Sequence, residues 1–220
     1  MWIVLNSVLG VDGGVVDPRG GSALLSCAHD RDSMDAIRAA ADAVLVGAGT
    51  IRTENPSLGV RSPVRRTERR STGRPEHPLP VILSTDGDLP ADRVVFETGE
   101  PRPLLLVARR RADVDARLAA VAEVEVLDAD AAAPVGVERA LARRGLRRLL
   151  VEGGPSVARA FVTAGLVDEV CLTLSPRLGG RPAPPADADH HLTELDLAES
   201  RAVQGFLYLR YLRRTPRHVD

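Results

Sequence analysis

Apolar positions along the chain follow two patterns, short continuous runs and longer stretches with helical spacing. Short runs rich in Val, Ile and Leu are typical of strands buried on both faces of a parallel sheet. Such runs cover residues 2–8, 42–46, 80–83, 103–107, 124–127, 148–151 and 167–174. Helical spacing predicts helices over residues 30–41, 112–121 and 135–144, and another that begins at Pro155 and ends near Gly165.

Strands alternate with helices through the first three quarters of the sequence. This alternation predicts one α/β domain over residues 1–214, with a mostly parallel central sheet and helices on both faces. Residues 202–212, around Gly205, predict two late strands that form an antiparallel C-terminal edge, and residues 215–220 are expected to be a tail. The arginine-rich stretch 61–78 also holds Ser, Thr, Pro and Gly, so we expect a solvated, mobile basic loop there.

Composition narrows the class of protein. The 220 residues can bury one good-sized core, and the net charge of −1 argues against nucleic-acid binding. Cys27 and Cys171 stand far apart, so we expect neither a disulfide framework nor a metal site. Without a basic start followed by a long apolar run, and without a run long enough to span a membrane, the sequence predicts a cytoplasmic protein.

Three predicted strand ends carry candidate chemistry, at residues 10–14, 47–56 and 152–156. Ligands bind beyond the carboxyl ends of parallel strands, and two of these ends are glycine-rich and enter helices. We therefore expect a dinucleotide to lie across this edge of the sheet. Gly47-Ala48-Gly49 is not a Rossmann fingerprint, because Arg52 stands where a third small residue is needed.

The stretch from Glu152 to Ser156 is the most informative of the three. Gly153 and Gly154 let a ligand approach the backbone, and Pro155 suits the first position of a helix, whose N-terminus can hold a phosphate. A carboxylate there would repel that phosphate, so Glu152 should point elsewhere, toward a substrate donor or a cation. The alternative is an ordinary turn in which Glu152 stabilises the helix dipole.

Residues 41–50 and 54–58, together with residues 151–156 and 164–169, resemble the RibD C-terminal family of pyrimidine reductases in riboflavin biosynthesis. The resemblance extends over residues 3–211. It implies a dihydrofolate-reductase-like fold, a homodimer and NADPH-dependent reduction. The ribosyl group of a 5-phosphoribosylamino-pyrimidine would become ribityl by hydride transfer to the sugar C1′.

The resemblance also implies a set of site residues. The substrate side comprises Ser22, Arg38, Glu54, Arg61 and Glu152. Arg38 and Arg61 would clamp the 5′-phosphate, Glu54 would supply the proton, and Glu152 would accept hydrogen bonds from the substrate. The cofactor groove comprises Asn6, Gly47, Thr50, Thr85, Gly153, Gly154, Ser156 and Val157. Apart from the resemblance, we expect Arg109 or Arg110 to hold the 2′-phosphate of NADPH, because arginines just after a strand often distinguish NADP from NAD.

Each of these residues also has a purely structural interpretation. Arg38 could be a solvated charge on a helix, Glu54 could cap a turn, and Ser22 could be an ordinary loop serine. Three positions depart from the family pattern, where Ser, Trp and Asp are usual instead of Gly10, Leu24 and Glu54. These departures leave open a reductase of the same fold acting on dihydrofolate or another metabolite, and a non-catalytic nucleotide-binding protein.

Overall fold

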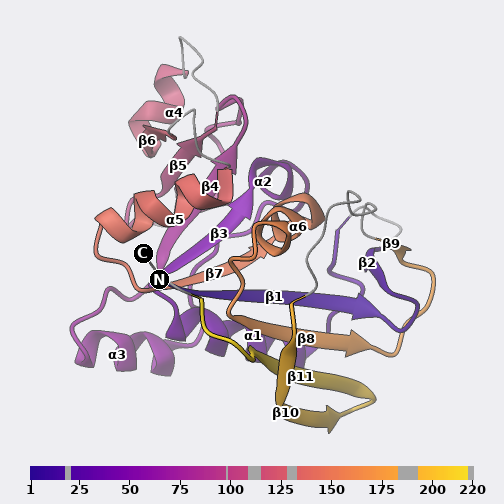
Figure 1. Ribbon diagram of the computed structural model, residues 1–220. Helices are drawn as coiled ribbons and strands as arrows, with labels where there is room; N and C mark the ends of the chain where they lie inside the picture. Colours follow the sequence, from indigo (N-terminus) through magenta and orange to yellow (C-terminus); the bar gives the residue numbers. More distant parts are fainter. Residues whose placement is uncertain (18–20, 98, 109–114, 128–132, 183–192, 218–220) are drawn as a thin grey trace.

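The fold is built on one sheet of nine strands, in the spatial order β10-β11-β8-β1-β7-β3-β4-β5-β6 (Figure 1). The computed structural model describes residues 1–17, 21–97, 99–108, 115–127, 133–182 and 193–217. The strands of this sheet are β1 (Trp2–Gly10), β3 (Ala43–Gly47), β4 (Leu79–Ser84), β5 (Leu104–Val107), β6 (Glu123–Val126), β7 (Arg148–Gly153), β8 (Glu169–Ser175), β10 (Leu195–Val203) and β11 (Phe206–Arg213). Seven of them, from β8 to β6, pair in parallel, as the alternating pattern predicts.

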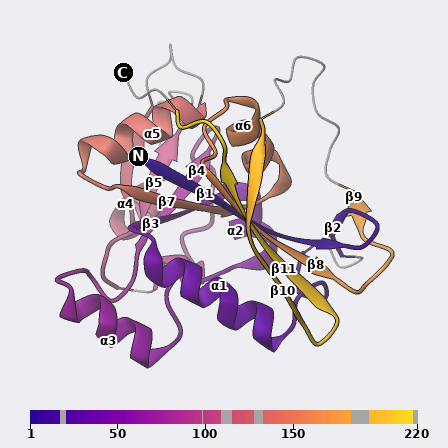
Figure 2. The ribbon, with the colours of Figure 1, turned by 60° about the horizontal axis from the view of Figure 1, so that its bottom comes forward.

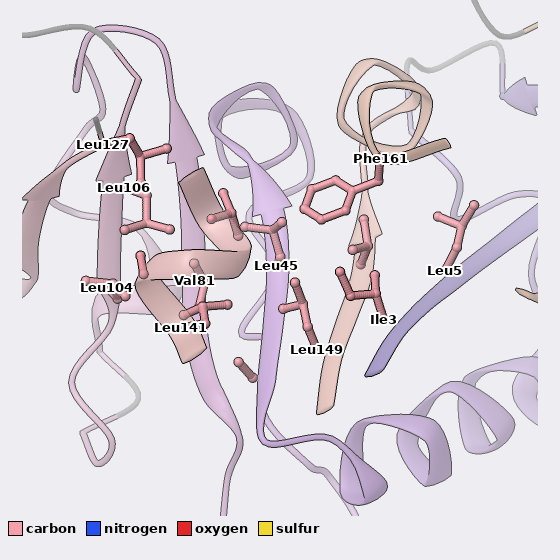
Figure 3. Packing of buried hydrophobic residues seen from close by; sticks show 14 of the residues in the cluster. Ile3, Leu5, Leu45, Val81, Leu104, Leu106, Leu127, Leu141, Leu149 and Phe161 are labelled. Carbon is pink, nitrogen blue, oxygen red and sulfur yellow. The ribbon is translucent and has the colours of Figure 1, made fainter. Parts of the chain in front are cut away.

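Helices cover both faces of the sheet (Figure 2). They are α1 (Ala28–Ala40), α2 (Ala48–Glu54), α3 (Pro63–Ser71), α4 (Ala116–Val121), α5 (Ala133–Arg143) and α6 (Pro155–Thr163), with a short 3₁₀ turn at Val94–Phe96. One core cluster joins the sheet to α5 and α6, and it includes Leu45 of β3, Leu141 of α5 and Phe161 of α6 (Figure 3). A second cluster packs the other face against α1, α2 and α4.

Alternation along β7 decides which way its last residues point. Leu149 and Val151 belong to the cluster under α5 and α6, whereas Leu150 belongs to the cluster on the α1 side. Because successive side chains of a strand point to opposite faces, Glu152 follows Leu150 toward α1. A bulge lies here, since Leu45 of β3 pairs with Val151 and Val46 with Gly153, so that Glu152 has no partner on β3.

The C-terminal edge is antiparallel, as expected. β11 pairs antiparallel with β8, and β10 pairs antiparallel with β11 through a turn at Gln204 and Gly205. The first strand of this pair begins at Leu195, earlier than the predicted start at residue 202. A separate small sheet joins β2 (Gly14–Val16) to β9 (Arg181–Pro182).

The expectation of a mobile loop over residues 61–78 is corrected by the structure, because this stretch contains the nine-residue helix α3. The Ser62 side chain caps this helix and Pro63 starts it. Arg69 is 2% exposed and donates to the carbonyls of Ala39 and Ala41 at the end of α1. Arginine-rich stretches usually lie in solvent, but here the buried Arg69 docks α3 onto the C-terminus of α1.

Two further boundaries differ from the prediction. The helix expected over 112–121 is described from Ala116, and residues 112–114 lie outside the described residues. Arg217, expected in a tail, donates to Asp168, Glu138 and the Met1 carbonyl, so the chain is anchored at this point. Within the described ranges, no helix is both long and apolar enough to cross a membrane.

Candidate active site

A cleft of about 1260 Å³ opens at the carboxyl ends of the central strands. β1, β7 and β3 are direct neighbours in the sheet. The loaded ends that follow β3 and close β7 line this cleft, whereas β1 contributes Asn6, Ser7 and Val8, and residues 10–14 are not among the lining residues. The residues expected at the site that line it are Asn6, Ser22, Arg38, Gly47, Thr50, Glu54, Arg61, Thr85, Glu152, Gly154, Ser156 and Val157. Among the expected site residues that the structure describes, Gly153 is the one that does not line it.

Gly153 and Gly47 are required by packing. A Cβ on Gly153 would lie 2.6 Å from Val46 Cα, and one on Gly47 would lie 2.8 Å from Val157 Cγ2. Real Cβ atoms do not approach so closely, so both positions exclude a larger residue. Gly153 therefore brings β7 close to β3, and Gly47 lets the first turn of α6 sit directly against the end of β3.

Gly154 shapes the start of α6. Its φ of 70° lies in the left-handed region, which glycine enters without steric cost. No side chain caps this helix, and Gly154, Ser156 and Val157 line the cleft. The first-turn N–H groups of an uncapped helix lack intrahelical partners and favour a bound anion. This end of the cleft therefore has the chemistry of a phosphate cradle.

Glu152 is withdrawn from that cradle by Arg38 of α1. Arg38 Nε donates to Glu152 Oε1 at 2.7 Å, and Nη2 donates to Oε2 at 2.6 Å. The two side chains are only 4% and 7% exposed, and the third nitrogen of Arg38, Nη1, donates to the Gly59 carbonyl at 3.2 Å. Of the two expected partners of Glu152, a substrate donor or a cation, the structure shows a cation, Arg38.

The expected clamp of Arg38 on a phosphate stays a prediction, because in this structure its guanidinium donates to Glu152 and Gly59. The interpretation of Arg38 as a solvated helix charge is wrong, since the residue is 3% exposed. Desolvation by itself would lower the pKa of Arg38, but the charge and hydrogen bonds of Glu152, together with the Asp35 charge, outweigh it and raise that pKa.

Glu54 carries the carboxyl best suited to proton transfer. It ends α2, lines the cleft and accepts a hydrogen bond from Ser22 Oγ at 3.3 Å. Loss of hydration raises the pKa of Glu54, the Ser22 hydrogen bond opposes that shift, and the nearby Asp17 charge adds to it. A carboxyl with a raised pKa holds its proton to higher pH, as a general acid requires.

Arg61 differs from the other arginines of its stretch. Arg65, Arg66, Arg69, Arg70 and Arg74 each have an ion pair or hydrogen bond through the side chain. The exposed Arg61 side chain lines the cleft and has no such partner among the residues that the structure describes. It is therefore available to a ligand.

Arg31 is a candidate that the sequence interpretation missed. It lies seven residues before Arg38 on α1, which places both on the same helix face, and it lines the cleft with an exposed side chain. The spacing of these two arginines, with Met34 between them on the same face, was the available signal. Arg109 and Arg110 lie outside the described residues.

Three other expected residues come from different parts of the chain. Asn6 belongs to β1, Thr50 to α2, and Thr85 comes directly after β4. They lie on three separate elements, and all line the same cleft. The cleft thus crosses the sheet edge from β1 to β4, as expected for a long ligand.

Comparison with known proteins gives consistent matches. The family model described as the RibD C-terminal domain matches residues 1–207. Over 185 residues, 83% of this chain, the sequence is 31% identical to the 2,5-diamino-6-ribosylamino-4(3H)-pyrimidinone 5′-phosphate reductase of Archaeoglobus fulgidus, of which 84% is covered. It is also 28% identical over 184 residues to the riboflavin biosynthesis protein RibD of Chlamydia pneumoniae, and spans about half of that relative (47%).

Among solved structures, a pyrimidine reductase-like protein from Corynebacterium diphtheriae superposes with a TM-score of 0.85 at 25% identity. The superposition covers 98% of this chain and 92% of the other. The near-complete coverage in both directions confirms the expected fold.

Proposed function

The chain belongs to the RibD C-terminal domain family, and from this membership and the cleft we propose that it is an NADPH-dependent reductase of a phosphorylated ribosylamino-pyrimidine. The observation that carries the proposal is the division of one cleft into two halves. The uncapped start of α6 favours phosphates on one side, and Glu54 with Arg31 and Arg61 offers a proton and positive charge on the other.

The phosphates of NADPH fit the first half because the helix start there is uncapped. Gly47 lets the first turn of α6 pack against the end of β3, Gly154 adopts the left-handed conformation before it, and no side chain caps its N–H groups. We assign Gly154, Ser156 and Val157 to the cofactor phosphates, with Asn6, Thr50 and Thr85 along the rest of the groove. When bound, the cofactor supplies a hydride from its nicotinamide ring.

The substrate half supplies a proton and holds an anion. A hydride added to C1′ of an opened ribosylamine leaves an electron pair on a neighbouring heteroatom, and this pair must take up a proton. Glu54 is the group that gives it, because its raised pKa keeps the carboxyl protonated to higher pH. Arg61 and Arg31 bind the 5′-phosphate with charge-assisted hydrogen bonds.

The Arg38–Glu152 ion pair lines the cleft, and we place it at the boundary between the cofactor half and the substrate half. Each carboxylate oxygen of Glu152 accepts one donor from Arg38, and each still has a lone pair for a substrate hydroxyl or N–H. The ion pair also neutralises the charge that would otherwise repel the cofactor phosphates. We therefore assign Glu152 to orienting the substrate and Arg38 to holding Glu152.

The choice of pyrimidine follows from the relatives. The Archaeoglobus fulgidus protein, which this chain covers at 84% of its length, is named for a 2,5-diamino-pyrimidinone substrate, whereas about half of RibD is matched. We propose the diamino compound as substrate, so that reduction precedes deamination, and a homodimer as the assembly.

The test is NADPH oxidation with the diamino-pyrimidinone phosphate, its deaminated uracil counterpart and dihydrofolate offered separately, with NADH as a second reductant. We expect turnover of the diamino compound with NADPH. Turnover of dihydrofolate alone would support the same fold with another substrate. NADPH binding without any turnover would support a non-catalytic nucleotide-binding protein. Sedimentation equilibrium of the same preparation measures the assembly.

A further inference from the structure

The four residues that carry Arg61 into the cleft, Gly59–Ser62, are each held by a side chain from elsewhere in the fold. The Gly59 carbonyl accepts from Arg38 Nη1 at 3.2 Å, and the Val60 N–H donates to His77 Nδ1 at 3.1 Å. The next two N–H groups, of Arg61 and Ser62, both donate to the carboxylate of Asp35, the second at 3.2 Å. A segment outside any helix or strand is thus fixed at four consecutive residues.

Asp35 is built to remain charged in this position. It lies on α1 and is 3% exposed. Desolvation by itself would raise the pKa of Asp35, but the N–H of Arg61, the Arg65 guanidinium at 2.9 Å and the N–H of Ser62 together lower it. One carboxylate that receives two successive N–H groups fixes the direction of the backbone between them.

His77 holds the preceding residue, Val60, through its backbone N–H. Its ring lies so close to Gly59 that a Cβ there would be 3.1 Å from Nδ1. Burial lowers the pKa of His77, with the Arg66 and Arg69 charges adding to the effect and Asp35 opposing it. The neutral ring keeps Nδ1 free to accept from Val60.

Two arginines of α3 bind α1, the helix that carries Asp35. Arg65 bridges Asp35 and Asp32 of α1, and Arg69 binds the carbonyls at the end of α1. These arginines are used inside the protein, whereas Arg61 is left without a partner among the described residues. Within the basic stretch, Arg65 and Arg69 therefore bind α3 to α1, whereas Arg61 lines the cleft.

We propose that Asp35 and His77 are positioning residues that aim Arg61 at the phosphate of the substrate. The proposal rests on the proposed function for the identity of that phosphate. A long side chain loses rotamer entropy when it binds a ligand, and fixing its backbone beforehand reduces what remains to be lost. Asp35 and His77 thus act on phosphate affinity through Arg61 and touch no reacting atom.

The test compares binding of ribose 5-phosphate by calorimetry in Asp35→Asn, Arg61→Ala and the double variant. Asn can accept one of the two N–H groups but opposes the other with its own donor. We expect each single variant to weaken binding about tenfold, and the double variant to bind no more weakly than Arg61→Ala. Asp32→Asn is the matched control, because Asp32 pairs with Arg65 but receives no N–H from the segment, and it should bind as wild type.

A second pair of variants covers the case in which Asp35→Asn does not fold. His77→Ala removes the acceptor for Val60, whereas His77→Asn can return an oxygen near the position of Nδ1. We expect weaker binding for His77→Ala and near wild-type binding for His77→Asn. With the pyrimidine substrate, the same variants should raise KM and leave kcat within about twofold.

The positioning role and the proposed function fail in different ways. Wild-type turnover of the pyrimidine together with unchanged ribose 5-phosphate binding in Asp35→Asn and His77→Ala would overturn the positioning role alone. Loss of ribose 5-phosphate binding in these variants, without any pyrimidine turnover by the wild type, would support positioning and contradict the proposed reaction. Additive losses in the double variant, or no ribose 5-phosphate binding by the wild type, would also overturn the positioning role.

Discussion

Arg38 and Glu152 form a two-pronged ion pair across 114 residues of sequence, with donor–acceptor distances of 2.7 and 2.6 Å. The pair joins α1 to the bulged end of β7 on the sheet face that carries α1. It explains how a carboxylate can sit next to a helix start that favours phosphates. Its charge is already matched, and its side chain points away from α6.

The first prediction concerns the burial of this pair. Arg38→Ala leaves the Glu152 carboxylate without its cation in a place where the side chain is 7% exposed. We expect the free energy of unfolding to fall by about 3–5 kcal/mol, measured by urea denaturation. Arg143→Ala is the control, because the Arg143–Glu125 pair is at the surface, and it should cost less than about 1 kcal/mol. Equal losses in the two variants would contradict the structural role of the buried pair.

The second prediction concerns Glu54. Glu54→Gln keeps the size of the side chain and removes the transferable proton. If Glu54 is the general acid, kcat should fall about 10²–10⁴-fold with little change in KM. Steady-state kinetics at saturating NADPH measure both values. A wild-type kcat in Glu54→Gln would show that Glu54 is not the general acid.

The third prediction concerns the hydrogen bond between Ser22 and Glu54. The Ser22 hydroxyl stabilises the charged carboxylate and lowers a pKa that loss of hydration raises. Ser22→Ala should therefore raise the pKa of Glu54 further. Since the acid form is active, the decline of kcat with rising pH should move to higher pH in this variant. A shift to lower pH would show that Ser22 acts on Glu54 in the opposite sense.

The fourth prediction separates two kinds of glycine beside the cleft. A Cβ on Gly153 would lie 2.6 Å from Val46 Cα, whereas one on Gly49 would meet nothing within 4 Å. Gly153→Ala should lower the free energy of unfolding by about 1–3 kcal/mol. Gly49→Ala, within α2, should leave stability unchanged or raise it by about 0.5–1 kcal/mol. Thermal unfolding of both variants decides this, and equal stability would refute the packing requirement at Gly153.

The sheet could be predicted from the sequence because its signals are local. Short apolar runs gave the strands, and glycines with one carboxylate marked the end of β7. The partner of Glu152 could not be predicted in this way, because Arg38 reaches it only after β1, β7 and α1 have come together. The contact of Asp35 with two backbone N–H groups is hidden for the same reason, since main-chain donors leave no trace in the side-chain pattern.

The helix α3 was not predicted although its signals are local. Its local signals were present, because Ser62 followed by Pro63 is typical of a helix start. The high arginine content nevertheless favours a solvated loop over a helix, since a run of like charges usually lies in solvent. Arg69 shows why that inference was wrong here. The carbonyls at the end of α1 give a buried guanidinium the acceptors that water would otherwise provide.

The central claim is hydride transfer to C1′ of a phosphorylated ribosylamino-pyrimidine. The most direct measurement uses NADPH that carries deuterium at both hydrogen positions of nicotinamide C4, so that either face delivers the label, with the product analysed by mass spectrometry and NMR. We predict one deuterium per molecule of product, located at C1′ of a ribityl chain. An unlabelled product, or a label at any other carbon, would contradict the assignment of this cleft as a ribosyl reductase site.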